Sequence, residues 1–290
     1  ALSLYLKCYF VSEQYNKKII MNKLFLVLTL FLSLFISGVK AVEYNMVFVP
    51  ASEKGDENDY EGLLKIVENI TNFKINTIKV TDYNAAVEAM RAGRAHIAWY
   101  GGKTYVKAAE IADAEAFAAG VRPGEKDAGY YTYFVVRDDS EIKNFKDIKG
   151  KVLSLNSIGS TSGDLIPQVE LTKINLSIKN ENDFKNVFYA GSHDACLLAV
   201  LNKKSDVCGM SSRNYEARLE DNTFQEKDVR IIHKSDKVPP PPLAYSKKIP
   251  LEHRLKIKNA VLEAHEYGEI GGYGGKMSHY ISVEDKDYNI

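Results

Sequence analysis

The chain has 290 residues, with 38 basic and 38 acidic side chains and three cysteines. This balance excludes a protein that binds nucleic acid or anionic membranes through its overall charge. The length suffices for one large domain or for two lobes of about 120 residues each, with an interior that needs no disulfide framework.

The first 41 residues are typical of a targeting segment. Met21-Asn22-Lys23 opens a short basic start, residues 24–36 form an apolar run, and Val39-Lys40-Ala41 offers small residues for cleavage. The run is shorter than the roughly 20 residues that cross a bilayer as a helix. We therefore expect a secretory signal peptide cleaved after Ala41, with a membrane anchor as the alternative. Residues 1–20 are interpreted as lying upstream of the true start.

Cleavage removes five lysines and one glutamate, which leaves 249 residues with 33 basic and 37 acidic side chains. A mildly acidic exported chain is not a general nucleic-acid binder. Cys196 and Cys208 are the two cysteines that follow the cleavage site. An exported pair oxidises where the geometry allows it, but a sequence cannot place the two Cα atoms. Two buried thiols are the favoured interpretation, and a disulfide is the alternative.

Strands and helices alternate along the remaining chain, which is typical of a parallel-rich α/β protein. Apolar and β-rich runs predict the first strands, at 44–49, 73–80, 96–100 and 130–136, and apolar spacing predicts helices at 60–70 and 83–92. A second set of units follows, with strands at 152–155, 187–189 and 206–210 and helices near 165–172 and 194–202. A stiff proline segment at 239–242 precedes a C-terminal helix at 251–267.

This repetition predicts two α/β lobes joined by extended crossings near 130–136 and 235–245, with a ligand cleft between the lobes. We assign residues 42–133 and 245–290 to lobe 1 and residues 134–244 to lobe 2. The C-terminal helix then returns to lobe 1.

Three hydroxyl residues in a row, Ser160, Thr161 and Ser162, stand between Gly159 and Gly163 just before a predicted helix. The first N–H groups of a helix are unpaired, and its N-terminus carries about half a positive charge. Hydroxyls add further donors there, so the pattern predicts a site for a tetrahedral oxyanion. The alternative is that one of the three residues merely caps the helix.

Several motifs in the right order resemble the substrate-binding proteins of phosphonate and phosphite ABC importers, over about residues 44 to 290. They are Thr81-Asp82-Tyr83, Ile97-Ala98-Trp99-Tyr100-Gly101, Gly129-Tyr130, Ser160-Thr161-Ser162-Gly163 with Pro167, and Ala190-Gly191 with His193. The resemblance implies a two-lobed periplasmic binding protein of type II. It implies a monomeric receptor in the periplasm that has no cofactor and no catalytic activity and that passes its ligand to an ABC permease in the inner membrane.

The resemblance also implies which residues surround the phosphorus oxyanion. They are Ser160, Thr161, Ser162 and His193 from one lobe, with Tyr83 and Tyr130 near the cleft. His193 can donate a hydrogen bond when neutral or pair as a cation with a dianion, and the tyrosines offer a donor and an apolar wall. Tyr100 is a further candidate, with a buried strand end as the alternative; for Trp99 the buried strand end is favoured.

The departures from the family pattern concern ligand choice. Arg213 and Pro241 fall where relatives that take aminoalkylphosphonates place acidic residues. A cation and a proline cannot satisfy an ammonium, so a small ligand is expected: phosphite, methylphosphonate or phosphate. Arg213 is interpreted as a contact to the anion or as a solvated surface residue. Asp194 is expected to cap the following helix, and orienting His193 is its alternative role.

Enzymes are the main rival class. The glycines around the hydroxyl run place Thr161 where a nucleophile elbow needs serine, and no P-loop lysine follows them. The six histidines show no metal-ligand spacing, and His253 and His265 are expected to face solvent. A secreted phosphatase and a receptor for another oxyanion, such as a sulfonate, are therefore the alternatives.

Overall fold

The computed structural model describes residues 21, 41–53 and 55–288. The chain divides into two units, Ala1–Ala41 and Val42–Ile290, and every element below belongs to the second. The predicted signal peptide, residues 21–41, falls almost entirely outside the described residues. None of the helices in the described part of the chain is long and apolar enough to cross a membrane.

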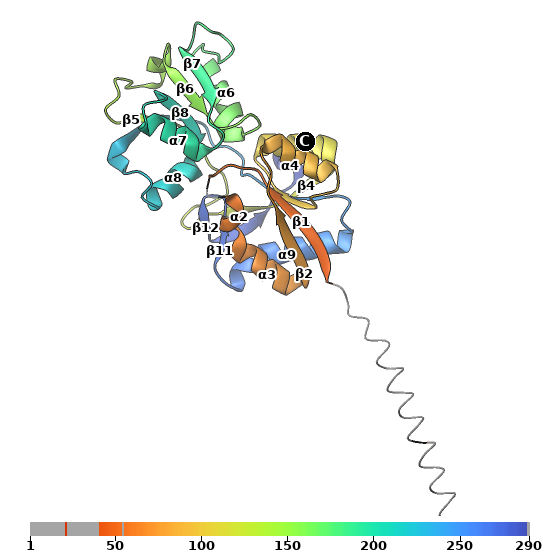
Figure 1. Cartoon of the computed structure of the whole chain (residues 1–290). Coiled ribbons are helices and arrows are strands. Elements are labelled where there is room, and N and C mark those ends of the chain that lie inside the picture. The colour runs from red at the N-terminus through yellow and green to blue at the C-terminus, as the bar shows by residue number, and fades with distance from the viewer. Residues whose placement is uncertain (1–20, 22–40, 54, 289–290) are drawn as a thin grey trace, which may run out of the picture. The chain divides into compact units, whose positions relative to one another are not determined.

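A six-stranded sheet combines strands from the two ends of this unit (Figure 1). Its order is β13-β4-β10-β3-β1-β2, where β1 is parallel to β2 and β3, and β10 is antiparallel to β3 and β4. The strands are β1 (Val42–Phe48), β2 (Phe73–Ile78), β3 (Ile97–Trp99), β4 (Ala114–Val121), β10 (Leu243–Ser246) and β13 (His279–Ser282). The late strands β10 and β13 return the chain to the sheet on which it began.

Five helices and a small hairpin accompany this sheet. The helices are α2 (Asp56–Asp59), α3 (Glu61–Thr71), α4 (Tyr83–Arg91), α5 (Gly102–Ala112) and α9 (Leu251–Glu263), with short 3-10 turns η4 (Ala264–Glu266) and η5 (Asp285–Tyr288). The hairpin consists of β11 (Ile270–Gly272) and β12 (Gly275–Met277). Helix α4 begins where Asp82 accepts a hydrogen bond from the Ala85 N–H at 2.9 Å, as an aspartate N-cap does.

A five-stranded sheet is formed by the middle of the chain, in the order β7-β6-β8-β5-β9. The strands are β5 (Thr132–Arg137), β6 (Val152–Leu155), β7 (Asn186–Tyr189), β8 (Val207–Ser211) and β9 (Val229–Lys234). The helices are α6 (Ile166–Thr172), α7 (His193–Leu201) and α8 (Ser212–Glu220), with the short turns η1 (Phe145–Ile148), η2 (Thr161–Leu165) and η3 (Glu226–Asp228). Parallel pairing of β6 with β7 and β8 brings the ends of these strands to one edge.

Two buried clusters flank this second sheet, because successive residues of a strand point to opposite faces. Phe134 and Val136 of β5 belong to one cluster, which includes Leu171 of α6. Val135, between them, belongs to the other, which includes Leu197 of α7. The first sheet has one extensive cluster of its own. Each sheet therefore has its own core, as expected for two lobes.

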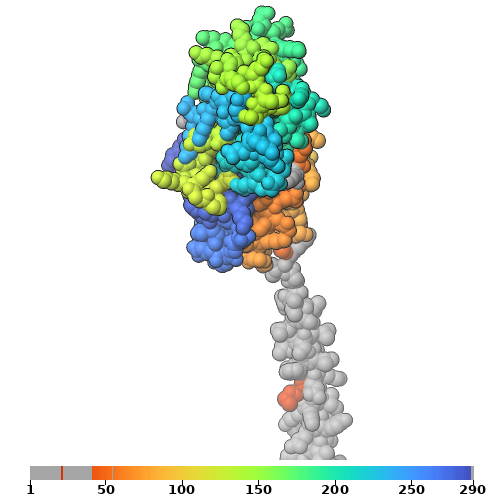
Figure 2. Space-filling view, turned by 90° about the vertical axis from the view of Figure 1, so that its left-hand side faces the viewer, coloured from red at the N-terminus to blue at the C-terminus, as the bar shows by residue number. Residues whose placement is uncertain are grey.

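The two crossings between the sheets lie side by side. Tyr130 and Val238 form an isolated antiparallel bridge, with N–H to O distances of 3.1 Å and 2.7 Å in the two directions. On the face shown in Figure 2, the green and cyan middle of the chain lies directly against its orange and blue ends.

One expectation for the C-terminal helix is corrected by the fold. His253 is only partly exposed: its Nδ1 lies 2.5 Å from the Tyr44 hydroxyl, and its ring centroid lies 4.7 Å from that of Phe73. It packs α9 onto the first sheet instead of facing solvent. His265, in contrast, is exposed as expected.

Candidate functional site

The hydroxyl run forms the start of a helix. The Ser160 Oγ accepts a hydrogen bond from the Gly163 N–H at 3.1 Å, and the π-helical turn η2 then continues into α6. The helical segment therefore begins at Thr161, earlier than the sequence predicts. Ser160 is an N-cap, which was the alternative to an anion site. The two roles are compatible because a hydroxyl that accepts one bond still has a proton to donate.

Gly163 allows an unusually close approach inside this turn. A Cβ at this position would lie 2.3 Å from the Asn156 Cβ and 2.9 Å from the His193 Cε1. The Asn156 N–H donates to the Gly163 carbonyl at 2.9 Å, and its Nδ2 donates to the Ser160 Oγ and the Tyr83 hydroxyl, each at 3.2 Å. Asn156, which sequence reasoning missed, therefore holds the turn in shape and ties it to lobe 1.

His193 is the first residue of α7 and is fully buried. Its Nδ1 accepts from the Ser211 N–H at 3.2 Å, so the ring proton lies on Nε2, which is 3.5 Å from the Ser162 Oγ. Burial lowers the His193 pKa to about 3. The ring is therefore a neutral donor, and of its two proposed roles the cationic one does not apply at neutral pH.

The cap of α7 is Ser192, not Asp194. The Ser192 Oγ accepts from the Ala195 N–H at 3.0 Å. Asp194 instead accepts from the Glu53 N–H at 2.9 Å and lies 3.6 Å from the Arg218 Nε. Its carboxylate thus joins α7 to the loop after β1, and the expectation of a helix cap is wrong.

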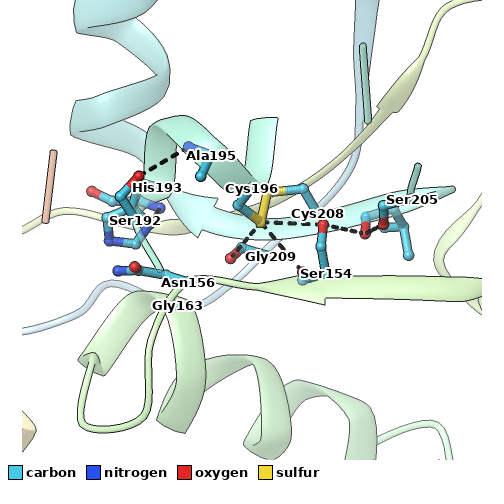
Figure 3. Close-up of a disulfide and its surroundings, with 12 residues drawn as sticks. Ser154, Asn156, Gly163, Ser192, His193, Ala195, Cys196, Ser205, Cys208 and Gly209 are labelled. Atoms are coloured by element: carbon cyan, nitrogen blue, oxygen red, sulfur yellow. Dashed lines mark hydrogen bonds between the residues drawn. A yellow bond between two sulfur atoms is a disulfide. The ribbon is translucent and has the colours of Figure 1, made fainter. Parts of the chain in front are cut away.

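Cys196 and Cys208 form a disulfide, which Figure 3 shows next to His193. The favoured interpretation of two buried thiols is therefore wrong. Cys196 lies on α7, which begins at His193, and Cys208 lies on β8, which ends at Ser211. The bridge therefore joins the two elements whose ends make the His193–Ser211 hydrogen bond.

These elements enclose a small cavity of about 10 Å³, which is room for about one water molecule. Its lining consists of Ala51, Tyr83, Trp99, Gly101, Tyr130, Ser160, Thr161, Ser162, His193, Pro241 and Tyr273. Six of the seven residues proposed from the sequence thus lie together around one space. Sequence reasoning missed Ala51, Gly101 and Tyr273, and it favoured a purely structural role for Trp99.

Tyr100 is the exception: it does not line the cavity, and its placement fits the alternative of a buried strand end. It is fully buried, and its hydroxyl donates to the Ala86 carbonyl at 3.3 Å, between β3 and α4. Trp99 lines the cavity in its place and packs against Tyr273, with ring centroids 4.6 Å apart. The buried Trp99 Nε1–H has no hydrogen-bond partner among the described residues.

Arg213 and Pro241 have different positions. Pro241 lines the cavity, whereas Arg213 does not. The Arg213 guanidinium is buried and donates to the Ala128 carbonyl at 2.7 Å and the Gly120 carbonyl at 3.3 Å. Both earlier interpretations of Arg213, a contact to the anion and a solvated surface residue, are therefore replaced by a structural role that joins α8 to β4.

Four helical segments begin at the cavity. They are α4 at Tyr83, α5 after Gly101, η2 after Ser160 and α7 at His193. Each helix N-terminus carries partial positive charge and orphan N–H groups, so the potential there favours an anion. The lining residues include no carboxylate. Within the described residues, no group of three metal-ligating side chains comes together.

The phenols that face this space are kept protonated. Burial raises the pKa of Tyr83 and of Tyr130 above the usual value for a phenol. Hydrogen bonds of Tyr130 with Ser162 and Thr161 oppose that shift. The site therefore presents neutral hydroxyl, indole and imidazole donors, with positive potential from backbone dipoles and no formal charge from its side chains.

Two α/β lobes around a cavity at converging helix N-termini define a periplasmic binding protein of type II. The chain belongs to the family described as "ABC transporter, phosphonate, periplasmic substrate-binding protein", whose model matches residues 46–288.

Individual relatives agree with this assignment. The chain is 28% identical over 223 residues to the phosphonates-binding periplasmic protein of Escherichia coli, which covers 75% of this chain and 64% of that protein. It is 31% identical over 198 residues to the phosphate-import protein PhnD of Mycolicibacterium smegmatis, covering 66% of this chain and 62% of the relative. It thus matches less than two thirds of either relative's length.

Among solved structures, a binding protein component of an ABC phosphonate transporter from Pseudomonas aeruginosa shares the fold. The TM-score is 0.75, with 22% identity over 86% of this chain and 84% of the other.

Proposed function

We propose that this protein is a periplasmic solute receptor that binds a small phosphorus oxyanion, such as phosphite or methylphosphonate, for import by an ABC transporter. The observation that carries the proposal is the convergence of four helical N-termini and several hydroxyl donors on one cavity without a carboxylate. Dehydrating an anion is costly unless donors are already in place. The arrangement supplies such donors before the ligand arrives.

The proposed ligand-binding residues are Tyr83, Tyr130, Ser160, Thr161, Ser162 and His193. To them we add Trp99 and Tyr273, which line the same cavity, and we leave out Tyr100. Hydroxyl groups, the neutral imidazole and the free indole N–H donate to the ligand's oxygens. The aromatic faces pack against a fourth, apolar substituent.

The cavity also limits the ligand. Its volume of about 10 Å³ is less than that of a phosphorus anion, so the ligand enters the open cleft and the lining side chains make room for it. Pro241 stands in the lining without a carboxylate beside it, so a substituent ending in an ammonium finds no counter-ion. We therefore expect 2-aminoethylphosphonate to bind weakly.

The cellular setting belongs to the same proposal. The signal peptide at about residues 21–41 directs export, and the mature chain works in the periplasm as a monomer. It docks on an ABC permease in the inner membrane, uses no cofactor and does no covalent chemistry. Lobe 1 comprises residues 42–133 and 245–290, and lobe 2 comprises residues 134–244. The family match to transport receptors supports this setting.

The test is isothermal titration of the protein from Val42 onward, freed of ligand by unfolding and refolding. Phosphite, methylphosphonate, 2-aminoethylphosphonate, phosphate and sulfate are titrated in turn. The proposal predicts tight binding of phosphite or methylphosphonate and weak binding of the other three. Heat from sulfate alone would make the protein a receptor for a different oxyanion. Turnover of a chromogenic phosphoester would favour a phosphatase.

A further inference from the structure

Helix α5 begins without a cap from its own segment of chain. Its N-cap residue is Gly101, which has no side chain to accept a hydrogen bond. The first N–H groups of a helix lack partners within the helix, and a serine, threonine, aspartate or asparagine usually supplies one. Here the acceptor comes from the other lobe. The N–H of Lys103 donates to the Thr161 Oγ1 at 2.9 Å.

Gly101 lies close to the Thr161 hydroxyl that caps α5. A Cβ at Gly101 would lie 3.1 Å from the Thr161 Oγ1, which is closer than an ordinary contact. Any side chain at this position would therefore push against the threonine. Glycine leaves the end of the helix open to a cap that only the second lobe provides.

Two further bonds secure the same contact. The Thr104 Oγ1 donates to the Gly159 carbonyl at 2.8 Å, and the Lys103 Nζ lies 2.5 Å from the buried Asp164 Oδ2. Asp164 also accepts from the Tyr189 hydroxyl at 2.7 Å. The whole first turn of α5 is thus docked on the turn that carries the predicted anion donors.

We propose that Thr161 is a positioning residue that caps α5 across the cleft and so couples ligand binding to closure of the lobes. Opening the cleft removes the cap, and closing it restores the cap. An anion that holds the Thr161 side chain in place stabilises the cap and therefore favours the closed arrangement. The identity of that anion rests on the proposed function, whereas the effect of the cap on closure of the ligand-free protein is independent of it.

The test follows closure by fluorescence energy transfer between dyes on two introduced cysteines. The protein from Val42 onward is used, with Lys179→Cys in lobe 2 and Asn259→Cys on α9. Both positions are exposed, whereas Cys196 and Cys208 are buried in their disulfide. The ligand-free protein should show a measurable closed population. Thr161→Val should raise its open-to-closed ratio about 2- to 30-fold, the range expected from losing a helix cap. Thr161→Ser keeps the Oγ and should restore the original ratio.

Asn144→Ala is the matched control, because it removes a cap that does not cross the cleft. Asn144 accepts from the Lys146 N–H at 3.0 Å within its own turn η1 and lies outside the cavity. The variant should change neither the ligand-free ratio nor methylphosphonate binding.

Three results overturn the proposal: no closed population without ligand, an unchanged ligand-free ratio in Thr161→Val, or a Thr161→Ser variant that behaves like Thr161→Val. If Thr161→Val shifts the ratio as predicted but methylphosphonate binds to no variant, the cap stands and the proposed ligand class fails.

Discussion

Replacing Gly163 by alanine should strongly weaken ligand binding by deforming the turn that presents Ser160, Thr161 and Ser162. The new Cβ would lie 2.3 Å from the Asn156 Cβ, whereas two carbon atoms in contact prefer about 3.5–4.0 Å. The gap has to widen by more than 1 Å. The Asn156 Cβ is attached directly to the backbone, so no side-chain rotation moves it away. The Asn156 backbone N–H is hydrogen-bonded to the Gly163 carbonyl, which also holds the two residues together.

The expected cost follows from this geometry. Overpacking typically costs about 1–3 kcal/mol, and a clash with a fixed atom belongs at the upper end. A misplacement of about 1 Å in a preorganised site costs on the order of 100-fold in function. Gly163→Ala should therefore lower the free energy of unfolding by about 3 kcal/mol and weaken methylphosphonate binding about 100-fold or more.

Urea unfolding and isothermal titration measure the two effects. Gly268→Ala is the matched control, since its Cβ would meet only the Ile66 Cδ1 at 3.5 Å, and it should behave as the unchanged protein. Affinity within about threefold of the original in Gly163→Ala would refute the argument that this turn is fixed by close packing.

Three other predictions concern the surroundings of the site. Replacing Cys196 and Cys208 together by alanine should lower the free energy of unfolding by about 3 kcal/mol, since the bridge closes a loop with a sequence separation of 12, and urea titration measures the loss. His193 has a folded-state pKa lowered to about 3, so between about pH 6.5 and 3 the unfolded chain binds a proton that the folded chain does not. Stability that is fully present above pH 6.5 should fall by about 1.4 kcal/mol per pH unit below it, and His193→Gln should flatten that slope in unfolding curves taken at several pH values. Arg213→Met should cost about 1–3 kcal/mol of stability by leaving the Ala128 and Gly120 carbonyls unpaired, yet titration should find the order of ligand preference unchanged because the side chain lies outside the cavity.

The sequence predicts the helix start at the hydroxyl run because the signal there is local. Three hydroxyl residues between two glycines precede a helical apolar pattern, and the structure places all three in the cavity lining. Local patterns also predict a helix close to His193, but they place its start at residue 194, whereas α7 begins at His193. Local patterns do not fix the exact cap, because serine and aspartate are both good caps. Ser192 is the cap because the helix begins at His193, and Asp194 instead accepts a hydrogen bond from the Glu53 N–H.

Other parts of the site could not be predicted because they depend on which face of an element meets the cleft. Trp99 ends β3 and Tyr100 follows it, and neighbouring residues point to opposite sides. Nothing in the pattern tells which side is the cavity. Tyr273 reaches the site from a hairpin far along the chain, and no short-range signal connects it with the hydroxyl run.

Several helices and strands were not predicted, and two strands and a helix among them illustrate a different reason. Strand β4 has the sequence AEAFAAGV, which is rich in alanine and therefore poor in strand propensity, yet it is fixed by pairing with β10 and β13 on its two sides. Helix α8 is short and carries few apolar residues, so its periodicity is weak. Strand β9 follows from its pairing with β5 at the edge of the second sheet. Tertiary pairing, which one sequence does not display, decides the two strands.

The most direct test of the account is isothermal titration of methylphosphonate into three proteins: the unchanged chain from Val42 onward, Ser160→Ala and Tyr100→Phe. The account predicts one-site binding to the first, the same affinity in Tyr100→Phe, whose hydroxyl lies outside the cavity, and a loss of about 1–3 kcal/mol in Ser160→Ala. Undiminished binding by Ser160→Ala, or an equal loss in Tyr100→Phe, would contradict the claim that the turn at Ser160 holds the anion.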